Sequence, residues 1–411
     1  MKKSLMRSLA IVFLLYGIAQ LSADNISFNG YGRSKAGALL SDWSVFMQEN
    51  TLDARFSWDT DTTLLYANLI LATDEDQIFN AAIRELYLHY YGDSFDIRIG
   101  KQQIIWGKSD AVFITDLVSP KDLSRFLVPD FEELRLAATG VRANLYSGNH
   151  QLEVVWLPLF TPTVQPAADS LWAPALPFPV QPTFLPSIKP DLKLSNGEYF
   201  ARYSWLGSSV DFSLMGGWFW NDTPSFSVVS KTITPSVGLT ALSVQGEYYR
   251  TASAGYGLSA RVGPVVLKSE GAFYFNKRYQ GNIAIYPQGY TEKNAIHYLV
   301  GTDFSISGTT LGLQFIQEII LDHEAALVDE AFTNTATLLL ARSFARDTVR
   351  LEALTYIGFA APDALIKPQV TWKITDGMEI AAGGWFFLGD SGAFGQYSDN
   401  SSIFASAKIY F

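Results

Sequence analysis

The sequence of 411 residues contains no cysteine and only four histidines. Without cysteine there is no disulfide scaffold, no thiol nucleophile, no thiolate metal site and no lipid-modified N-terminal cysteine. Charged residues are also scarce, at 17% of the chain, against about 25% in ordinary soluble proteins. The 40 acidic and 30 basic residues give a net charge of −10, which excludes a basic nucleic-acid-binding protein.

Motifs that carry enzyme chemistry are missing as well. There is no P-loop, no Rossmann fingerprint and no cluster of metal-ligand type. Of the histidines, His89 and His297 fall on expected strands, His150 in a turn and His323 in a loop, and none belongs to a Ser/His arrangement. We therefore expect no enzyme activity, no cofactor and no metal. A plug domain is not expected either, because Ile26 opens the first strand almost at once.

The first 23 residues have the pattern of a secretory signal peptide. Lys2, Lys3 and Arg7 form a basic start, Leu9 to Ala19 is apolar, and Ala23 offers a small residue before a cleavage point. The apolar stretch is too short to cross a bilayer as a helix. We expect a mature domain of residues 24–411 that leaves a bacterial cytoplasm.

The mature chain contains no plausible transmembrane helix. Its longest charge-free apolar candidate, Ser170 to Ile188, contains five prolines. A lipid-exposed helix cannot accommodate them, because each removes a backbone donor that lipid cannot replace. If the mature protein spans a membrane, it must do so as a closed β-barrel.

Apolar and polar residues alternate with a period of two along most of the chain. At the C-terminus, Ile403, Ala405, Ala407, Ile409 and Phe411 alternate with more polar neighbours. Such segments run about 9 to 14 residues, the length of a tilted strand that crosses a hydrocarbon core. A soluble sandwich produces the same alternation, so periodicity alone does not decide between the two.

The connections between strands favour the barrel, because short and long ones take turns. The short turns fall near Asp59–Thr62, Gly92–Ser94, Ser147–Asn149, Gly207–Ser208, Val262–Gly263, Ser307–Gly308, Ser343–Arg346 and Thr375–Gly377. Nine mostly longer loops lie between them, which predicts 18 strands, or 16 if the poorly defined stretches 41–45 and 221–244 are miscounted. This predicts an all-β, antiparallel transmembrane barrel with short periplasmic turns and longer extracellular loops.

Aromatic residues gather where the strands should meet the lipid headgroups, as amphipathic rings do. We place them at turn ends (Trp58, Tyr91, Tyr146, Trp205, Phe304) and at loop ends (Trp106, Trp156, Trp220, Phe275, Trp385). The terminal Phe411, after an alternating strand, resembles the C-terminal signal of Gram-negative outer-membrane barrels. That resemblance implies the barrel assembly machinery as a partner and the bacterial outer membrane as the location, with outer-membrane lipid around the barrel.

One region resembles a known family. The stretch GKQQIIWGKSD at residues 100–110 looks like the signature of a large group of uncharacterised Gram-negative outer-membrane barrels, related in style to general and alginate-export porins. Residues 116–123 and 126–131 continue the match, and the rest of the chain shares only the general texture of a barrel. The resemblance supports the fold and implies no particular solute.

The loop at residues 106–134 is long and dense in charge. By analogy with general porins, we expect it to fold into the barrel and narrow it; the alternative is a solvated external loop. The candidates for lining the pore or its constriction, from this loop and from the inward side of the strands, are Arg33, Lys35, Arg55, Arg98, Lys108, Asp110, Asp116, Lys121, Asp122, Arg125, Asp130 and Arg142. Basic and acidic residues are balanced on the inward side, which predicts weak ion selectivity.

The loop at residues 159–195 is rich in proline and unusually apolar for an external loop. It is expected to cap the mouth, to pack inside the barrel or to capture a greasy or aromatic solute. The leading hypothesis is a porin-like channel for passive diffusion of small hydrophilic solutes. The alternatives are a transporter of hydrophobic or aromatic solutes or lipids, and a non-conducting adhesin or structural barrel. A homo-oligomer is left open.

Overall fold

A computed structural model describes residues 25–73, 78–109, 111–175 and 178–411. The expected signal peptide at residues 1–23 lies outside the described residues. Within the described part of the chain, no helix is both long and apolar enough to pass through a membrane.

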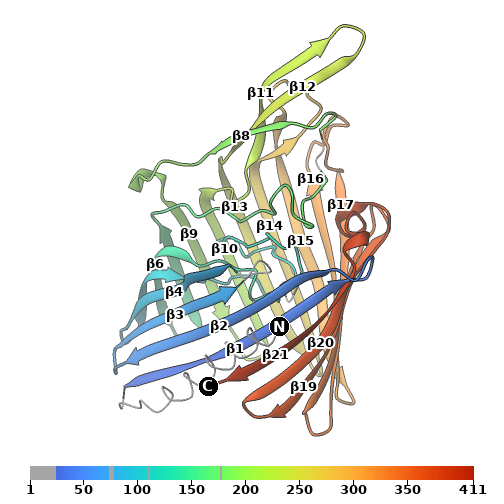
Figure 1. The fold of residues 1–411 in the computed structure, drawn as a ribbon. Helices are drawn as coiled ribbons and strands as arrows, with labels where there is room; N and C mark the ends of the chain where they lie inside the picture. Colours follow the sequence, from blue (N-terminus) through green and yellow to red (C-terminus); the bar gives the residue numbers. More distant parts are fainter. Residues whose placement is uncertain (1–24, 74–77, 110, 176–177) are drawn as a thin grey trace.

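Eighteen strands form one closed antiparallel sheet, as predicted (Figure 1). Its strands are β1 (Ile26–Leu39), β2 (Val45–Asp59), β3 (Thr63–Thr73), β4 (Phe79–Tyr91), β5 (Phe95–Gln102), β6 (Ala138–Ser147), β7 (His150–Leu157), β9 (Glu198–Leu206), β10 (Val210–Trp220), β13 (Arg250–Val262), β14 (Val265–Gln280), β15 (Tyr290–Ile306), β16 (Thr309–Ile320), β17 (Phe332–Phe344), β18 (Val349–Gly358), β19 (Asp363–Thr375), β20 (Met378–Leu388) and β21 (Ser402–Tyr410). The first and last strands pair from Tyr31↔Tyr410 to Leu39↔Ser402, which leaves the sheet without an edge.

The alternation expected along the last strand is visible in its pairing with β1. Lys35, which is buried inside the barrel, lies opposite Ser406, and Arg33 lies opposite Lys408. Ile403 and its alternate neighbours therefore face outward, where lipid would meet them. The polar side chains of both strands face the interior.

The eight short turns lie at one end of the barrel and the longer connections at the other, as expected. Two of the longer connections carry structure that alternation along the chain did not predict. Strands β11 (Ser225–Thr234) and β12 (Gly238–Glu247) form a hairpin, and β8 (Thr183–Ile188) pairs with β12 in parallel. This three-stranded sheet projects beyond the loop end of the barrel (Figure 1).

Two tryptophans expected at the lipid boundary are instead buried inside the barrel. Trp106 lies beyond the end of β5, where the chain has already turned inward, and its indole N–H donates to Glu153. Trp385 lies on the inward face of β20 and stacks on Phe404 with ring centroids 4.5 Å apart. Both are 2% exposed, so neither belongs to an aromatic girdle.

The wall has uneven height around the barrel. β5 and β7 have only 8 residues each, whereas β15 has 17. β4 pairs with β5 only from Leu86 to Tyr91, so its residues 79–85 extend past the end of β5. Above that level the chain leaves the wall after Gln102. Two residues before this point, Gly100 has a φ of +135°, a conformation that residues with a side chain rarely adopt.

Replacing Gly100 should therefore harm barrel assembly. We expect Gly100→Val to cost about 1–3 kcal/mol through backbone strain, and to lower the fraction of folded, heat-modifiable barrel in gel electrophoresis without boiling. The matched control is Gly32→Val, at an outward position where an added Cβ meets no atom within 4 Å. Equal folding of the two variants would contradict the role given to Gly100.

Candidate functional site

The described residues of 103–137, namely 103–109 and 111–137, are here called the inner segment and run through the barrel interior. On one side, Glu270 of β14 accepts two hydrogen bonds, from the backbone N–H of Lys108 (2.6 Å) and the hydroxyl of Thr115 (2.5 Å). Ser109 donates to Gln314 of β16 (3.0 Å). Glu270 is fully buried, so these hydrogen bonds form away from bulk water and hold the segment firmly.

The inner segment also contacts the opposite wall. The amino group of Lys367 on β19 donates to the carbonyls of Leu127 (2.6 Å) and Pro129 (3.3 Å). On β1, Arg33 forms an ion pair with Glu133 (2.8 Å). Contacts with strands this far apart around the barrel place the segment across the lumen.

Internal contacts give the inner segment its own shape. Asp116 pairs with Arg135 (2.5 Å) and accepts the backbone N–H of Trp106 (3.0 Å). Apolar side chains, including Ile104 and Trp106, pack against Val155 and other inward residues of the wall. The segment is thus a folded insert with a small core rather than a flexible chain.

A second segment lies over the first. The described residues 159–175, here called the strap, pair with the inner segment through Val164, whose N–H donates to Lys121 and whose carbonyl accepts from Leu123. Farther along, Trp172 packs against Phe387 and Tyr397, with ring centroids 5.7 and 6.0 Å away. The strap therefore crosses from β7 to the loop that joins β20 and β21.

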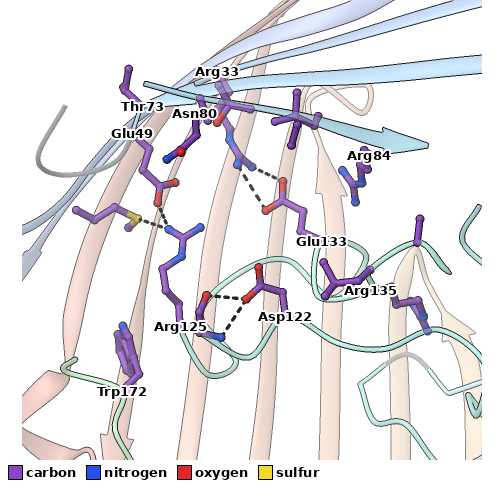
Figure 2. A pocket seen from close by; sticks show the side chains of 18 of the residues that line it. Arg33, Glu49, Thr73, Asn80, Arg84, Asp122, Arg125, Glu133, Arg135 and Trp172 are labelled. Atoms are coloured by element: carbon purple, nitrogen blue, oxygen red, sulfur yellow. Dashed lines mark hydrogen bonds and ion pairs between the residues drawn. The ribbon is translucent and has the colours of Figure 1, made fainter. Parts of the chain in front are cut away.

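The described residues line two large cavities inside the barrel. The outer vestibule, of about 1170 Å³, lies toward the loop end and is bounded by β1–β6, the inner segment and the strap (Figure 2). The inner vestibule, of about 1260 Å³, lies toward the turn end. Tyr31, Arg84, Glu133 and Arg135 line both cavities, so the vestibules adjoin at this group, here called the neck.

Charged side chains around the outer vestibule are largely paired. Arg33 and Glu133 point toward each other, and Arg125 is directed at Glu49, with which it forms an ion pair (Figure 2). Arg84 donates to the backbone carbonyl of Glu132 (3.2 Å). These contacts hold cationic and anionic groups in fixed positions along the path.

The structure separates the predicted lining residues into three groups. Arg33, Asp122 and Arg125 line the outer vestibule, and Arg55, Lys108 and Asp130 line the inner one. The others face neither cavity: Asp116 is buried in its pair with Arg135, Lys121 donates to the Asp116 carbonyl, Lys35 lies against the rings of Trp385 and Phe404, Arg98 lies over Tyr87, and Arg142 pairs with Glu153. Asp110 lies outside the described residues.

Four neck residues were not among the predicted lining residues. Arg84 occupies a bulge in β4, because Asn68 of β3 pairs with Glu85 and Leu69 with Ile83. A bulge breaks the period of two, so alternation gives no prediction for its side chain. Arg135 lies just past the expected loop. Tyr31 does fall on the inward parity of β1, and this signal could have identified it.

A family model described as "Protein of unknown function (DUF1302)" matches residues 22–375. The chain belongs to this family. No curated protein matches the sequence.

Solved structures with a similar fold include three barrels of Pseudomonas aeruginosa, each with a TM-score of 0.54. OccK5 (OpdH) is 9% identical over 94% of this chain and 98% of its own, and OccK8 (OprE) is 10% identical over 94% and 97%. OccD3 (OpdP) is 7% identical over 95% and 92%. The DUF1302 chain thus shares the fold of outer-membrane porins. Among its described residues, no group of three or more His, Cys, Asp or Glu side chains is placed to hold a metal ion.

Removing the Glu270 carboxylate should loosen the inner segment. Glu270→Gln replaces one acceptor oxygen with a donor, and each lost hydrogen bond to a charged group costs about 1.5–3 kcal/mol. We expect faster limited proteolysis within residues 103–137. The control is Glu352→Gln, whose partner Arg350 is exposed on the same strand. Unchanged proteolysis in Glu270→Gln would show that other contacts suffice.

The outer loops should respond to pH through Asp222. Its backbone carbonyl accepts the N–H of Thr163 in the strap (3.1 Å). Desolvation raises the pKa of its carboxyl from 3.8 to about 7, although Lys121 opposes the rise. Because the same carboxyl ionises at lower pH once it is exposed to water, the packed arrangement is most stable below about pH 4 and loses this stability as pH rises toward 7.

We therefore expect proteolysis of the strap to accelerate between pH 4 and 7 in the wild type, and this acceleration to vanish in Asp222→Asn. The control is Asp399→Asn, which removes an exposed carboxylate from the loop after β20. Parallel profiles for the wild type and Asp222→Asn would contradict the assignment.

Proposed function

We propose that the protein is a bacterial outer-membrane channel, without enzyme activity, through which small hydrophilic solutes diffuse passively. The observation that carries the proposal is the neck, at which two cavities of about 1170 and 1260 Å³ share Tyr31, Arg84, Glu133 and Arg135. A solute that crosses the barrel along its axis passes from one vestibule to the other at these side chains. The inner segment then acts as the constriction.

The charges at the neck favour weak ion selectivity. Arg84 and Arg135 contribute positive charge, Glu133 contributes negative charge, and Arg33 and Asp116 pair with members of this group. Cations and anions thus meet partners of both signs over a short distance. Such a lining screens a charged solute without strongly rejecting either sign.

Insertion into the outer membrane follows from the same proposal. The last strand presents Ile403 and its alternate neighbours to the outside, and the chain ends at Phe411, whose N–H donates to Gly30 of β1 (3.1 Å). We propose that the assembly machinery recognises this strand before it pairs with β1. The pairing then closes the barrel in outer-membrane lipid.

A second candidate function, transport of hydrophobic or aromatic solutes, is favoured by the apolar residues of the outer vestibule. The lining of this cavity includes Phe46, Ile70, Leu171 and Trp172, and the rings of Phe46 and Trp172 have centroids 6.3 Å apart. The third candidate, a closed structural barrel, predicts no solute flux at all. Liposome swelling in sugars separates this closed barrel from the proposed channel.

The neck can be tested through Glu133. We expect Glu133→Ala to widen the neck and to leave Arg33 without its carboxylate, so that single-channel conductance rises and the reversal potential in a salt gradient shifts toward anions. Planar-bilayer recordings measure both quantities. Glu330→Ala, which removes an exposed loop carboxylate, is the control for net charge.

Two results would count against the channel. A wild-type protein that neither conducts nor swells liposomes would support the closed barrel. Identical conductance and reversal potential in Glu133→Ala and Glu330→Ala would remove the neck from the permeation path.

A further inference from the structure

The wall of the barrel lacks a strand beside the outer end of β4. Residues 79–85 of β4 pair with β3, but β5 has already ended at Gln102, and the chain turns into the lumen there. β6 starts at Ala138 beside the end of β5 and supplies no partner for this part of β4. The departure that forms the inner segment therefore leaves a notch in the wall.

The outer vestibule reaches through this notch. Most of its wall residues face the lumen, including Ile70 and Ala82, which pair with each other. Lys101 and Thr139, however, pair across β5 and β6 on the outward face, because the next pair, Gln102 and Ala138, is buried inside. Both outward residues line the cavity, as does Ile83, which is 47% exposed. A cavity lined by both faces of a wall passes through it.

Contacts at the notch compensate for the missing strand. The amino group of Lys101 donates to the carbonyl of Ile83 (2.7 Å), and the backbone N–H of Gln103 donates to Glu85 (2.8 Å). In hydrocarbon, a backbone group without a partner costs several kcal/mol. The side chains of Lys101 and Glu85 thus satisfy backbone groups that a neighbouring strand would otherwise pair.

The height of the notch places it in the outer half of the membrane. From Tyr91 at the turn end, the eight residues up to Ile83 rise roughly 20 Å along a strand tilted by about 40°. The apolar band of such barrels is about 25 Å tall. Ile83 and Thr139 therefore meet the acyl chains near their outer boundary.

We propose that this notch, lined by Ile83, Lys101 and Thr139 and here called the side opening, exchanges amphipathic solutes between the outer vestibule and the lipid. Such a solute has an apolar body and an anionic head. Ile70, Ala82, Ile83, Leu136 and Ala137 offer the body an apolar path. The cationic groups of Arg84 and Lys101 stand at the same place for the head. This route shares Arg84 with the neck but does not pass through the neck into the inner vestibule.

The test blocks the side opening with a bulky side chain. Thr139→Trp fills it, whereas Val141→Trp adds the same side chain two residues lower on the same outward face, beside Ile99. Intact Gram-negative cells that express the full chain are mixed with 8-anilino-1-naphthalenesulfonate, an anionic aromatic dye whose fluorescence rises in lipid. We expect the wild type and Val141→Trp to accelerate dye entry over cells without the protein, and Thr139→Trp to lose the acceleration.

Conductance separates this proposal from the proposed channel. All three proteins should conduct ions equally in planar bilayers, because the axial path is unaltered. Equal dye entry with Thr139→Trp and Val141→Trp, or no acceleration by the wild type, overturns the side opening and leaves the channel standing. If the wild-type protein does not conduct ions, the proposed channel is overturned and the side opening is not.

A second measurement keeps the proposal falsifiable if Thr139→Trp fails to fold. Because the chain has no cysteine, Ala82→Cys and Leu339→Cys each provide one site for a fluorescent label. Ala82 faces the outer vestibule at the side opening, and Leu339 lines the inner vestibule on β17. Brominated lipid should quench the label at residue 82 more strongly than at residue 339; equal quenching overturns the proposal.

Discussion

The need to pair every backbone group that faces lipid governs this structure. Seventeen hairpin contacts and the β1–β21 closure meet that need around the barrel, and the chain breaks the pattern at Gln102, where it stops pairing and turns inward. An unpaired backbone can exist at membrane depth only where protein or water satisfies it. Inside the barrel, Glu270 accepts the backbone N–H of Lys108, and Lys367 donates to the backbone carbonyls of Leu127 and Pro129. The constriction and the notch in the wall are two consequences of this one departure.

Filling the lumen with the inner segment also buries charged side chains. Asp116 and Glu153 are almost fully buried, and each is matched by arginine at hydrogen-bond distance. Leaving either carboxylate without its partner would cost more than the pair contributes, because desolvation falls on the remaining charge. The Asp116–Arg135 pair therefore holds the inner segment in one fold, and Glu153 ties that fold to the wall by accepting the indole N–H of Trp106 (3.0 Å).

The sequence predicts the barrel well and the site only in part, for physical reasons. Alternation and turn length are local, so the eighteen strands and the two classes of connection follow from them. The contacts that position the inner segment and the neck are not local: Lys108 meets Glu270 162 residues away, and Arg33 meets Glu133 100 residues away. Arg84 could not be predicted, because the bulge in β4 breaks the alternation that assigns a residue to one face of the wall. Asp116 lies in the predicted segment, but its carboxylate forms a buried ion pair with Arg135 and so does not line a cavity.

The proposed channel and the proposed side opening give the outer vestibule two exits that differ in the solutes they favour. A sugar gains no free energy by entering lipid, and only the path through the polar neck lets it stay hydrated. For an amphipathic solute, each methylene that leaves water for lipid contributes about 0.8 kcal/mol, so a path along Ile83 to the acyl chains is downhill. The lining of the cavity includes both the charged pairs that suit the first solute and apolar residues that suit the second. One cavity thereby sorts solutes by their hydration, without a moving part.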